Sequence, residues 1–404
     1  MNALQHLLND LAQVERWPTK PAEKTAVVEY LAAKFQSGQS YNETQINLLL
    51  KAWHTFEDWA LLRRELVDRG FLTREANGSS YVRTALGVSD IPHRLKLENI
   101  QQAAQVIDPV FLNTPQFPAE SLGEVLGLEL VVKVETLNPI RSFKGRGADY
   151  FFVRNPNLLE VICASAGNFG QGMAYAARKQ GIRQTVFTSV YANPLKIARM
   201  QALGATVRLV GEDFDAAKLV AKEYAAAHGL PFVEDGHKPE LSEGAATMGL
   251  ELLRYPKPFD TLLIPLGNGA MIAGIARWVK ALAPRVQVVG VSAAGAPAME
   301  QSWRSGTLVQ TPSITTIADG IGVRIPVPEA LQDLKGLVDE VLLVEDPTIL
   351  QAMRLVHQHL GLVLEPSGAV GIAALLAHPQ FKGQRVATVL CGSNLTPAQM
   401  EARL

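Results

Sequence analysis

The sequence is poor in cysteine and has no excess of either charge. Its two cysteines among 404 residues, Cys163 and Cys391, lie far apart and lack the spacing of a zinc site or a disulfide framework. Two isolated thiols favour a reducing, cytoplasmic location. The 38 lysines and arginines balance 39 aspartates and glutamates, giving a formal net charge of −1. This balance argues against nucleic-acid and membrane-surface binding by the chain as a whole.

The sequence also lacks a run of about 18 apolar residues, which a membrane-spanning helix would need. Acids and amides interrupt the leucines at its start, so no signal peptide is expected. Hydrophobic residues nevertheless make up 48% of the chain. At roughly 150 residues per domain, a chain of this length is expected to form two or three domains with sizeable cores.

The first 84 residues show helical periodicity followed by a hairpin signal. Asn42 is followed three residues later by Gln45, a pattern typical of a capping box. Near the end of the segment, Asn77-Gly78 separates two short apolar runs and predicts a tight turn. Helices that end in a hairpin predict a winged-helix module. The predicted helices cover residues 4–14, 27–35, 42–53 and 57–68.

Residues 17–84 resemble a small winged-helix-like family to which no activity is attached. Residues 1–84 contain ten lysines and arginines and ten aspartates and glutamates, a net charge of zero. DNA-binding modules usually carry a basic surplus. An amino-acid-sensing transcription regulator therefore stays only as a remote alternative, which depends on the cluster Arg63, Arg64 and Arg69.

From about residue 95, apolar strand-like runs alternate with alanine-rich helical segments. This alternation predicts an α/β fold with parallel sheets, whose functional sites lie at the carboxyl ends of the strands. The predicted strands are 130–134, 161–163, 185–188, 206–210, 261–265, 286–291 and 386–390, and the predicted helices include 172–180, 195–203, 215–228, 272–283 and 347–360.

Several short motifs follow the predicted strands in a fixed order. The first is the lysine motif Ser142-Phe143-Lys144, and the second is the turn from Ser165 to Asn168. The third is a glycine-rich turn whose open N–H groups suit an anion at a helix start. Each turn alone is weak evidence, but their order is specific. The glycine-rich turn is GNGAM at 267–271, and the remaining motifs are ADGIGVR at 318–324, EPSGAVG at 365–371 and LCGSN at 390–394.

This series of motifs resembles the fold type II pyridoxal-phosphate enzymes, the tryptophan synthase β family, and within it the serine/threonine dehydratases. The resemblance covers about residues 98–404. It implies a two-lobed catalytic domain over 85–404, preceded by the winged-helix-like domain over 1–84. A small lobe at about 138–236 would be inserted in the large lobe.

The resemblance also implies roles for individual residues around pyridoxal 5'-phosphate. Lys144 matches the Schiff-base lysine and would act as the catalytic base, since a neutral amine can accept the Cα proton. Asn168 would bond the ring hydroxyl, and Cys391 would face the pyridine nitrogen. The implied cofactor contacts are Phe143, Lys144, Asn168, Gly267, Asn268, Gly269, Ala270, Met271, Glu365 and Cys391, and the implied substrate contacts are Ser165, Ala166, Gly167, Asn168 and Phe169.

Two of these positions bear on the reaction type. A thiol at Cys391 is neutral and a weak donor, so it would not keep the pyridine nitrogen protonated; this favours elimination over racemisation. An alanine at 166 cannot move a proton, where related racemases carry a serine. Glu365 could equally hold a loop by accepting backbone hydrogen bonds. No metal site is expected, because a solvated or core role is preferred for Glu243 and Glu251.

The sequence therefore predicts an ammonia-lyase that converts a β-hydroxy amino acid such as threonine or serine to a 2-oxo acid and ammonia. Threonine synthase or another β- or γ-replacement enzyme of this fold is the alternative, and the pair Gly267-Asn268 leans toward it. ADGIGVR instead resembles the dehydratase branch. The expected partners are an amino-acid substrate and further copies of the chain, in a homodimer or larger homo-oligomer.

Overall fold

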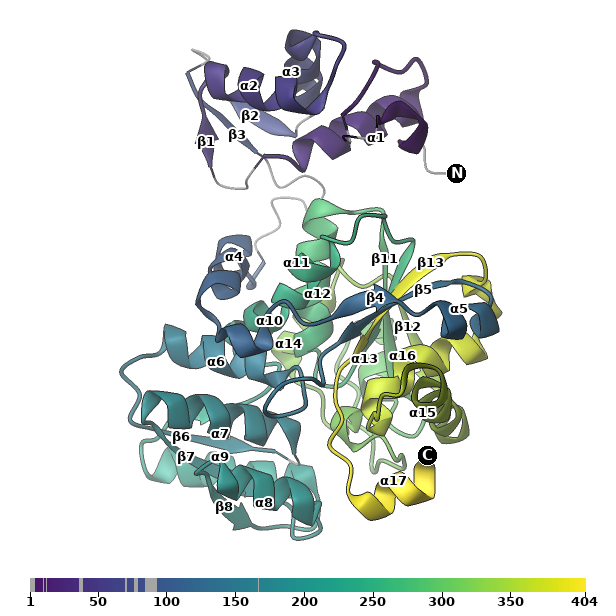
Figure 1. Ribbon diagram of the computed structural model, residues 1–404. Helices are drawn as coiled ribbons and strands as arrows, with labels where there is room; N and C mark the ends of the chain where they lie inside the picture. Colours follow the sequence, from purple (N-terminus) through teal and green to yellow (C-terminus); the bar gives the residue numbers. More distant parts are fainter. Residues whose placement is uncertain are drawn as a thin grey trace. The chain divides into compact units, whose positions relative to one another are not determined.

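The computed structural model describes residues 4–9, 11, 13–35, 39–69, 71–75, 79–83, 93–165 and 167–404. The chain divides into two compact units, one of residues 1–91 with 281–284 and the other of residues 92–280 with 285–404. Both are drawn in Figure 1, and each is described here by itself. None of the described helices is long and apolar enough to span a membrane.

The described residues of the first unit form three α-helices and a three-stranded antiparallel sheet of order β1-β3-β2. Asn42 caps α2 through a capping box with Gln45, as predicted. The helix predicted over residues 4–14 is wrong, because residues 5–7 form a short 3-10 turn and Leu8 bridges to Val14. The turn at Asn77-Gly78 lies outside the described residues. The elements are η1 (Gln5–Leu7), α1 (Pro21–Ala32), β1 (Ser40–Tyr41), α2 (Glu43–Trp53), α3 (Trp59–Asp68), β2 (Leu72–Arg74) and β3 (Tyr81–Arg83).

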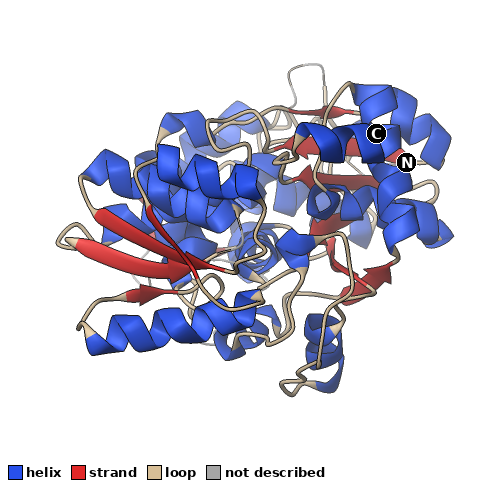
Figure 2. Cartoon of the chain, turned by 90° about the horizontal axis from the view of Figure 1, so that it is seen from below, coloured by secondary structure: helices blue, strands red, loops and turns tan. Residues whose placement is uncertain are grey.

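The second unit is an α/β structure with two sheets, which confirms the predicted fold class (Figure 2). The larger sheet has the order β12-β11-β10-β13-β5-β4 and is parallel except for β4, which runs antiparallel to β5. All seven predicted strands are present. The larger sheet consists of β4 (Gln116–Pro118), β5 (Glu129–Val134), β10 (Thr261–Pro265), β11 (Gln287–Ala293), β12 (Glu340–Val344) and β13 (Arg385–Leu390).

The smaller sheet has the order β8-β7-β6-β9 and is parallel throughout. Residues of β6 alternate between two cores: Val161 and Cys163 pack with α7, and Ile162 and Ala164 pack with α9. Because successive strand residues point to opposite faces, a helix layer covers each face of this sheet. Its strands are β6 (Glu160–Ala164), β7 (Arg183–Thr188), β8 (Thr206–Leu209) and β9 (Phe232–Val233), flanked by α6 (Lys144–Arg154), α7 (Asn168–Gln180), α8 (Pro194–Ala202) and α9 (Phe214–Ala227).

Helices also cover the larger sheet. All ten residues from Pro366 to Leu375 of α16 are buried, and this helix contacts β10 to β13. All five residues of β10 are buried too, as expected for a parallel strand covered on both faces. The remaining elements are α4 (Leu97–Val106), η2 (Pro109–Phe111), α5 (Glu120–Leu126), α10 (Pro239–Ala245), α11 (Thr247–Leu252), α12 (Ala270–Leu282), α13 (Ala298–Ser305), η3 (Asp319–Ile321), α14 (Pro328–Leu334), α15 (Asp346–Leu360), α16 (Pro366–Ala377), η4 (Pro379–Phe381) and α17 (Pro397–Arg403).

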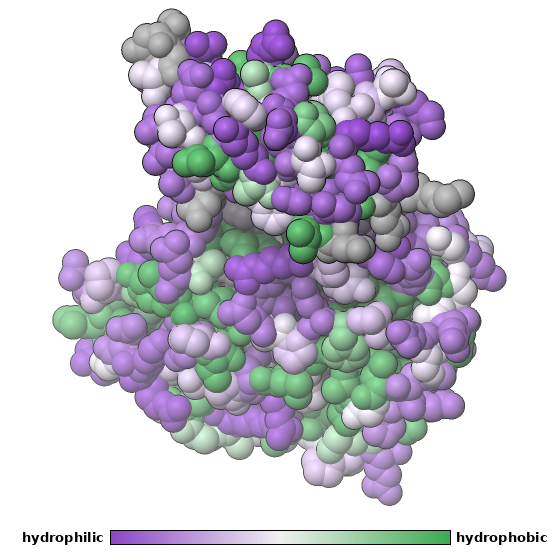
Figure 3. Space-filling model, turned by 45° about the horizontal axis from the view of Figure 1, so that its top comes forward, coloured by the Kyte–Doolittle hydropathy of each residue, from purple (hydrophilic) through white to green (hydrophobic). Residues whose placement is uncertain are grey.

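On the face of the molecule shown in Figure 3, hydrophilic residues cover most of the surface and hydrophobic ones gather in small groups. Such scattered apolar groups are ordinary for a protein surface. The buried hydrophobic residues of the second unit instead gather in cores between its helices and its two sheets.

A buried ionic network links three elements of the second unit. Arg146, which is fully buried, donates to both Glu135 carboxylate oxygens at 2.8 and 2.9 Å and to both Glu251 oxygens at 2.7 and 2.9 Å. The Lys133 ammonium lies 2.5 Å from Glu251. Burial by itself raises the pKa of Glu251, but the hydrogen bonds and charges of Arg146 and Lys133 outweigh it and lower the pKa to about 2.

This shift predicts an acid-dependent loss of stability. Because the pKa of Glu251 in the folded state lies below the ordinary value of 4.5, its stabilising contribution is complete above pH 4.5 and is lost as the pH falls toward 2. A Glu251→Gln variant should lose on the order of 3 kcal/mol of unfolding free energy at pH 7 and show a flatter acid dependence. Urea unfolding at several pH values measures both. Glu129→Gln, at an exposed ion pair with Arg385, should cost less than about 1 kcal/mol.

Candidate active site

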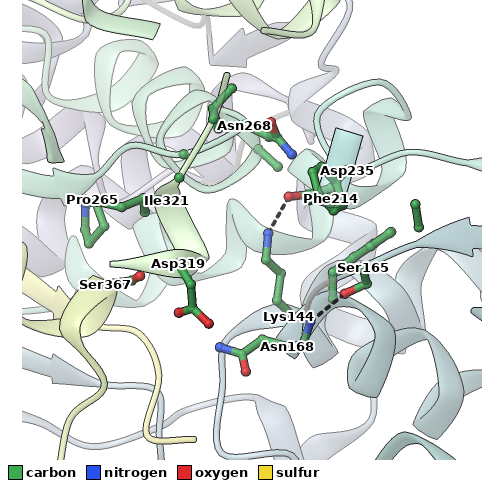
Figure 4. A pocket seen from close by; sticks show the side chains of 18 of the residues that line it. Lys144, Ser165, Asn168, Phe214, Asp235, Pro265, Asn268, Asp319, Ile321 and Ser367 are labelled. Carbon is green, nitrogen blue, oxygen red and sulfur yellow. Dashed lines mark hydrogen bonds and ion pairs between the residues drawn. The ribbon is translucent and has the colours of Figure 1, made fainter. Parts of the chain in front are cut away.

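One cavity of about 240 Å³ collects the predicted site residues in the second unit. The Lys144 side chain points into it, and the carboxyl ends of strands from both sheets open toward it (Figure 4). Ala166 lies outside the described residues. The predicted residues that line the cavity are Phe143, Lys144, Ser165, Gly167, Asn168, Phe169, Gly267, Asn268, Gly269, Ala270, Met271, Glu365 and Cys391.

Backbone hydrogen bonds fix the position of Lys144 at the start of α6. The Phe143 N–H donates to the carbonyl oxygen of Cys391 at 3.1 Å, and Ser142 bridges to Gly392. The side-chain Nδ2 of Asn138 also donates, to the carbonyl oxygens of Glu135 and Ser142 at 2.8 and 3.1 Å. The turn that carries the lysine is therefore held against the end of β13.

The Lys144 ammonium has an anionic partner that the sequence did not indicate. Its Nζ lies 2.5 Å from Oδ2 of Asp235, as Figure 4 shows. The Phe143 ring centre lies 4.7 Å from the same nitrogen, and the Phe169 ring centre lies 5.9 Å from it. Asp235 follows β9, a strand of two residues, so no strand-length signal marks its position in the sequence.

The glycine-rich turn before α12 is closely packed by backbone on two sides. A Cβ at Gly267 would lie 3.1 Å from Cα of Ile321, and a Cβ at Gly236 would lie 2.4 Å from the Asn268 carbonyl oxygen. Gly269 has a φ of +89°, which side chains rarely adopt. The turn leads into a helix of 13 residues, whose first N–H groups have no acceptor within the helix. This geometry forms an anion cradle and fits a phosphate group.

Asn168 is held by two side chains in the cavity wall. Its Nδ2 donates to Oε1 of Glu365 at 2.5 Å, and its Oδ1 accepts from Nδ2 of Asn394 at 2.7 Å. Glu365 also accepts from the Asn394 backbone N–H at 3.2 Å, which is the loop-holding role considered from the sequence. Burial raises the pKa of the Glu365 carboxyl above its ordinary value. The Asn168 amide is thus fixed in orientation.

Cys391 and Ser367 line the cavity together. Burial raises the pKa of the Cys391 thiol well above its usual range, so the thiol is neutral at pH 7. Its Sγ lies 3.6 Å from the carbonyl oxygen of Ser367. The buried Ser367 Oγ has no hydrogen-bond partner among the described residues. A buried hydroxyl without a partner is costly, and a bound polar group in the cavity could satisfy it.

The two carboxylates considered as cation ligands, Glu243 and Glu251, have partners within the protein. The part of the chain that the structure describes contains no group of three or more His, Cys, Asp or Glu residues that could hold a metal ion. Glu251 binds Arg146 and Lys133. Glu243 accepts from the Lys96 N–H and from the Asn99 amide, both at 2.9 Å.

Comparisons with known proteins identify two regions of the chain. Residues 107–392 match the family model described as pyridoxal-phosphate dependent enzyme. Residues 13–83 match a family described as an uncharacterised protein conserved in bacteria. The first match covers the cavity, and the second covers most of the first unit.

Individual relatives agree with the first match. L-threonine ammonia-lyase of Thermotoga maritima is 34% identical over 307 residues, which are 74% of this chain and 76% of the relative. The structure of processed threonine deaminase isoform 2 from Solanum lycopersicum superposes with a TM-score of 0.70 at 30% identity, covering 77% of this chain and 94% of that one. Maize serine racemase gives 0.72 at 25% identity, covering 77% and 97%.

The anion cradle can be tested through cofactor retention. A Gly267→Ala methyl group would press on the backbone of residues 320 and 321, so pyridoxal phosphate should bind roughly tenfold more weakly. Absorbance of the cofactor that remains bound during dialysis measures the change. Gly306→Ala is the control, because that glycine also has a positive φ but no atoms within 4 Å of the added Cβ. Equal loss in both variants would contradict the cradle.

Proposed function

Because the chain belongs to the family of pyridoxal-phosphate dependent enzymes, we propose that it is an ammonia-lyase for a β-hydroxy amino acid such as L-threonine or L-serine. The products would be a 2-oxo acid and ammonia. The observation that carries the proposal is that Lys144, the anion cradle and Cys391 line one cavity. The relatives named above as threonine ammonia-lyase and threonine deaminase support the substrate class.

The residues of the cavity suit each part of the cofactor. The turn from Gly267 to Met271 would hold the phosphate at the start of α12. Phe143 would lie against the ring, and the fixed Asn168 amide would bond the ring hydroxyl oxygen. The neutral Cys391 thiol would face the ring nitrogen. A neutral weak donor there leaves the ring less electron-poor than a carboxylate partner would.

When bound, pyridoxal phosphate supplies an electron sink that stabilises negative charge at the substrate Cα. Lys144 would remove the Cα proton with Nζ and return a proton to the departing β-hydroxyl, which leaves as water. Asp235 lies 2.5 Å from that nitrogen and would hold the lysine in place while it carries the proton. Loss of water leaves an enamine. After its release, the bond between Cα and nitrogen is hydrolysed, which yields the 2-oxo acid and ammonia.

One set of assays distinguishes three reactions considered for an enzyme of this fold. The purified full chain with pyridoxal phosphate should form 2-oxo acid from L-threonine or L-serine. Phosphate release confined to O-phosphohomoserine would instead indicate the replacement alternative. Interconversion of L- and D-serine without 2-oxo acid would indicate a racemase.

The regulator alternative loses support from the charges of the first unit. Arg63 is 2.7 Å from Glu43, and Arg69 is 2.6 Å from Glu65. Two of the three arginines of the basic cluster are therefore already paired with carboxylates. Four expectations stay predictions: the domain boundary near residue 84, the inserted small lobe, the homo-oligomeric state and the cytoplasmic location.

Replacing the lysine tests the central assignment. Lys144→Ala should abolish 2-oxo acid formation, because no other amine is assigned to remove the Cα proton. It should also remove the absorbance band of lysine-bound cofactor. Lys382→Met, which removes an exposed lysine that does not line the cavity, should leave both unchanged. Turnover by Lys144→Ala at the wild-type rate would refute the assignment.

Asp235 is expected to act through Lys144. Asp235→Asn should lower kcat roughly 10- to 100-fold with KM changed less than twofold, because the lysine loses the carboxylate that positions it. Asp235→Glu should restore part of kcat, since it keeps the charge. Steady-state kinetics on L-threonine measure both values. A rise in KM at unchanged kcat would assign Asp235 to substrate binding instead.

A further inference from the structure

The cavity wall contains three cationic side chains besides Lys144, and they differ in how their charge is balanced. Lys218 lies 3.1 Å from Asp215 and 3.4 Å from Glu234. Arg324 lies 3.3 Å from Asp215 and 3.5 Å from Asp213. Each of these two cations is therefore shared between two carboxylates.

Lys196 has a simpler environment. Among the described residues, the carboxylate within ion-pair distance of its Nζ is that of Asp319, at 2.6 Å. Burial by itself lowers the pKa of Lys196, but the charges of Glu365 and Asp319 outweigh it and raise the pKa above its ordinary value. The lysine therefore stays protonated at neutral pH. An ammonium has three donors, so it can take a further acceptor.

The position of Lys196 is fixed by α8. Its side chain is only 4% exposed, although lysine side chains are seldom fully buried. The Asn193 side chain caps this helix by accepting from the Leu195 N–H at 2.9 Å. The lysine stem passes directly over Gly167, where a Cβ would lie 2.3 Å from Cδ of Lys196. The ammonium is thus held beside the turn that begins α7.

That turn adds further attraction for an anion. Gly167 is the cap of α7, a helix of 13 residues. The N–H groups of Gly167 and Gly170 donate to Ser165 Oγ at 3.1 and 2.8 Å, and the first N–H groups of a helix have no acceptor within it. The helix start also has a partial positive charge. A buried ammonium beside these N–H groups is suited to a carboxylate.

Asp319 is a carboxylate that can leave this position. It belongs to the short turn η3 between Ala318 and Gly322, and its side chain is 49% exposed. Its side chain accepts a hydrogen bond from Lys196. Figure 4 shows its carboxylate turned toward the same part of the cavity as the Asn168 amide. A half-exposed carboxylate with one ion pair loses little when it returns to water.

We propose that Lys196 binds the α-carboxylate of the amino-acid substrate, and that Asp319 occupies this position until the substrate displaces it. The inference rests on the proposed function, since it requires a substrate with a carboxylate. Lys196 comes from α8 beside the smaller sheet, whereas Asp319 comes from η3, which packs on α16. When substrate binds, the ion pair between Lys196 of α8 and Asp319 of η3 would therefore be replaced by one between Lys196 and the substrate carboxylate.

The test compares L-threonine with L-threoninamide, which lacks the carboxylate charge. Lys196→Met should lower kcat/KM for L-threonine roughly 10- to 100-fold, the range for a charged hydrogen bond. The value for the amide should change less than threefold, so the preference for the acid collapses. Lys196→Arg should keep the preference, and Lys382→Met, at an exposed lysine outside the cavity wall, should behave like the wild type.

The Asp319→Asn variant should bind L-threonine more tightly, whereas Lys196→Met should bind it more weakly. Removing the competing carboxylate should lower KM for L-threonine several-fold without lowering kcat. A purely structural ion pair would instead make Asp319→Asn and Lys196→Met impair both substrates alike. Either equal losses on both substrates or a raised KM in Asp319→Asn would overturn the proposal.

Failure of the proposed function gives a different pattern. In that case the wild type would form no 2-oxo acid from any β-hydroxy amino acid. Titration of the cofactor absorbance of the wild type and of Lys196→Met with L-threonine and L-threoninamide still measures binding. Loss of binding confined to the acid supports the assignment of Lys196, and equal binding of acid and amide by the wild type contradicts it.

Discussion

The catalytic part of this protein depends on a buried arginine. Arg146 lies two residues after Lys144, and its guanidinium binds carboxylates at the end of β5 and in α11. Removing one partner from such a network would leave an uncompensated charge in the core. The arginine therefore ties the start of α6 to two other elements, and this fixes the backbone that presents Lys144 to the cavity.

The turn before Lys144 and the larger sheet position the opposite wall of the cavity. The turn before Lys144 bonds to Cys391 at the end of β13, and β13 lies between β10 and β5 in the larger sheet. Since parallel strands end at one edge, the glycine-rich turn after β10 lies on the same side as Cys391. The lysine, the thiol and the anion cradle consequently face each other across a short distance.

Charges in the cavity are matched in a way that suits an amino-acid substrate. Asp235 pairs with the lysine that would move protons, and Asp319 pairs with the lysine that would bind a carboxylate. Each acid holds a cation in place inside a partly buried site, where an unpaired charge would be costly. The two pairs differ in exposure, because Asp319 is half-exposed and Asp235 is mostly buried. This difference in exposure suits Asp235 to positioning Lys144, and it suits Asp319 to giving up its ion pair with Lys196.

The sequence by itself determined the fold class, the seven strands it predicted and the residues that motifs mark, because local periodicity and turn chemistry are encoded by neighbouring residues. It missed the short strands β4 and β9 and the five-residue strand β12, and it wrongly extended a helix over residues 4–14. It also did not pair Lys144 with Asp235, Lys196 with Asp319, or Arg146 with Glu251. These partners are 91, 123 and 105 positions apart, and only tertiary packing brings such distant side chains within ion-pair distance.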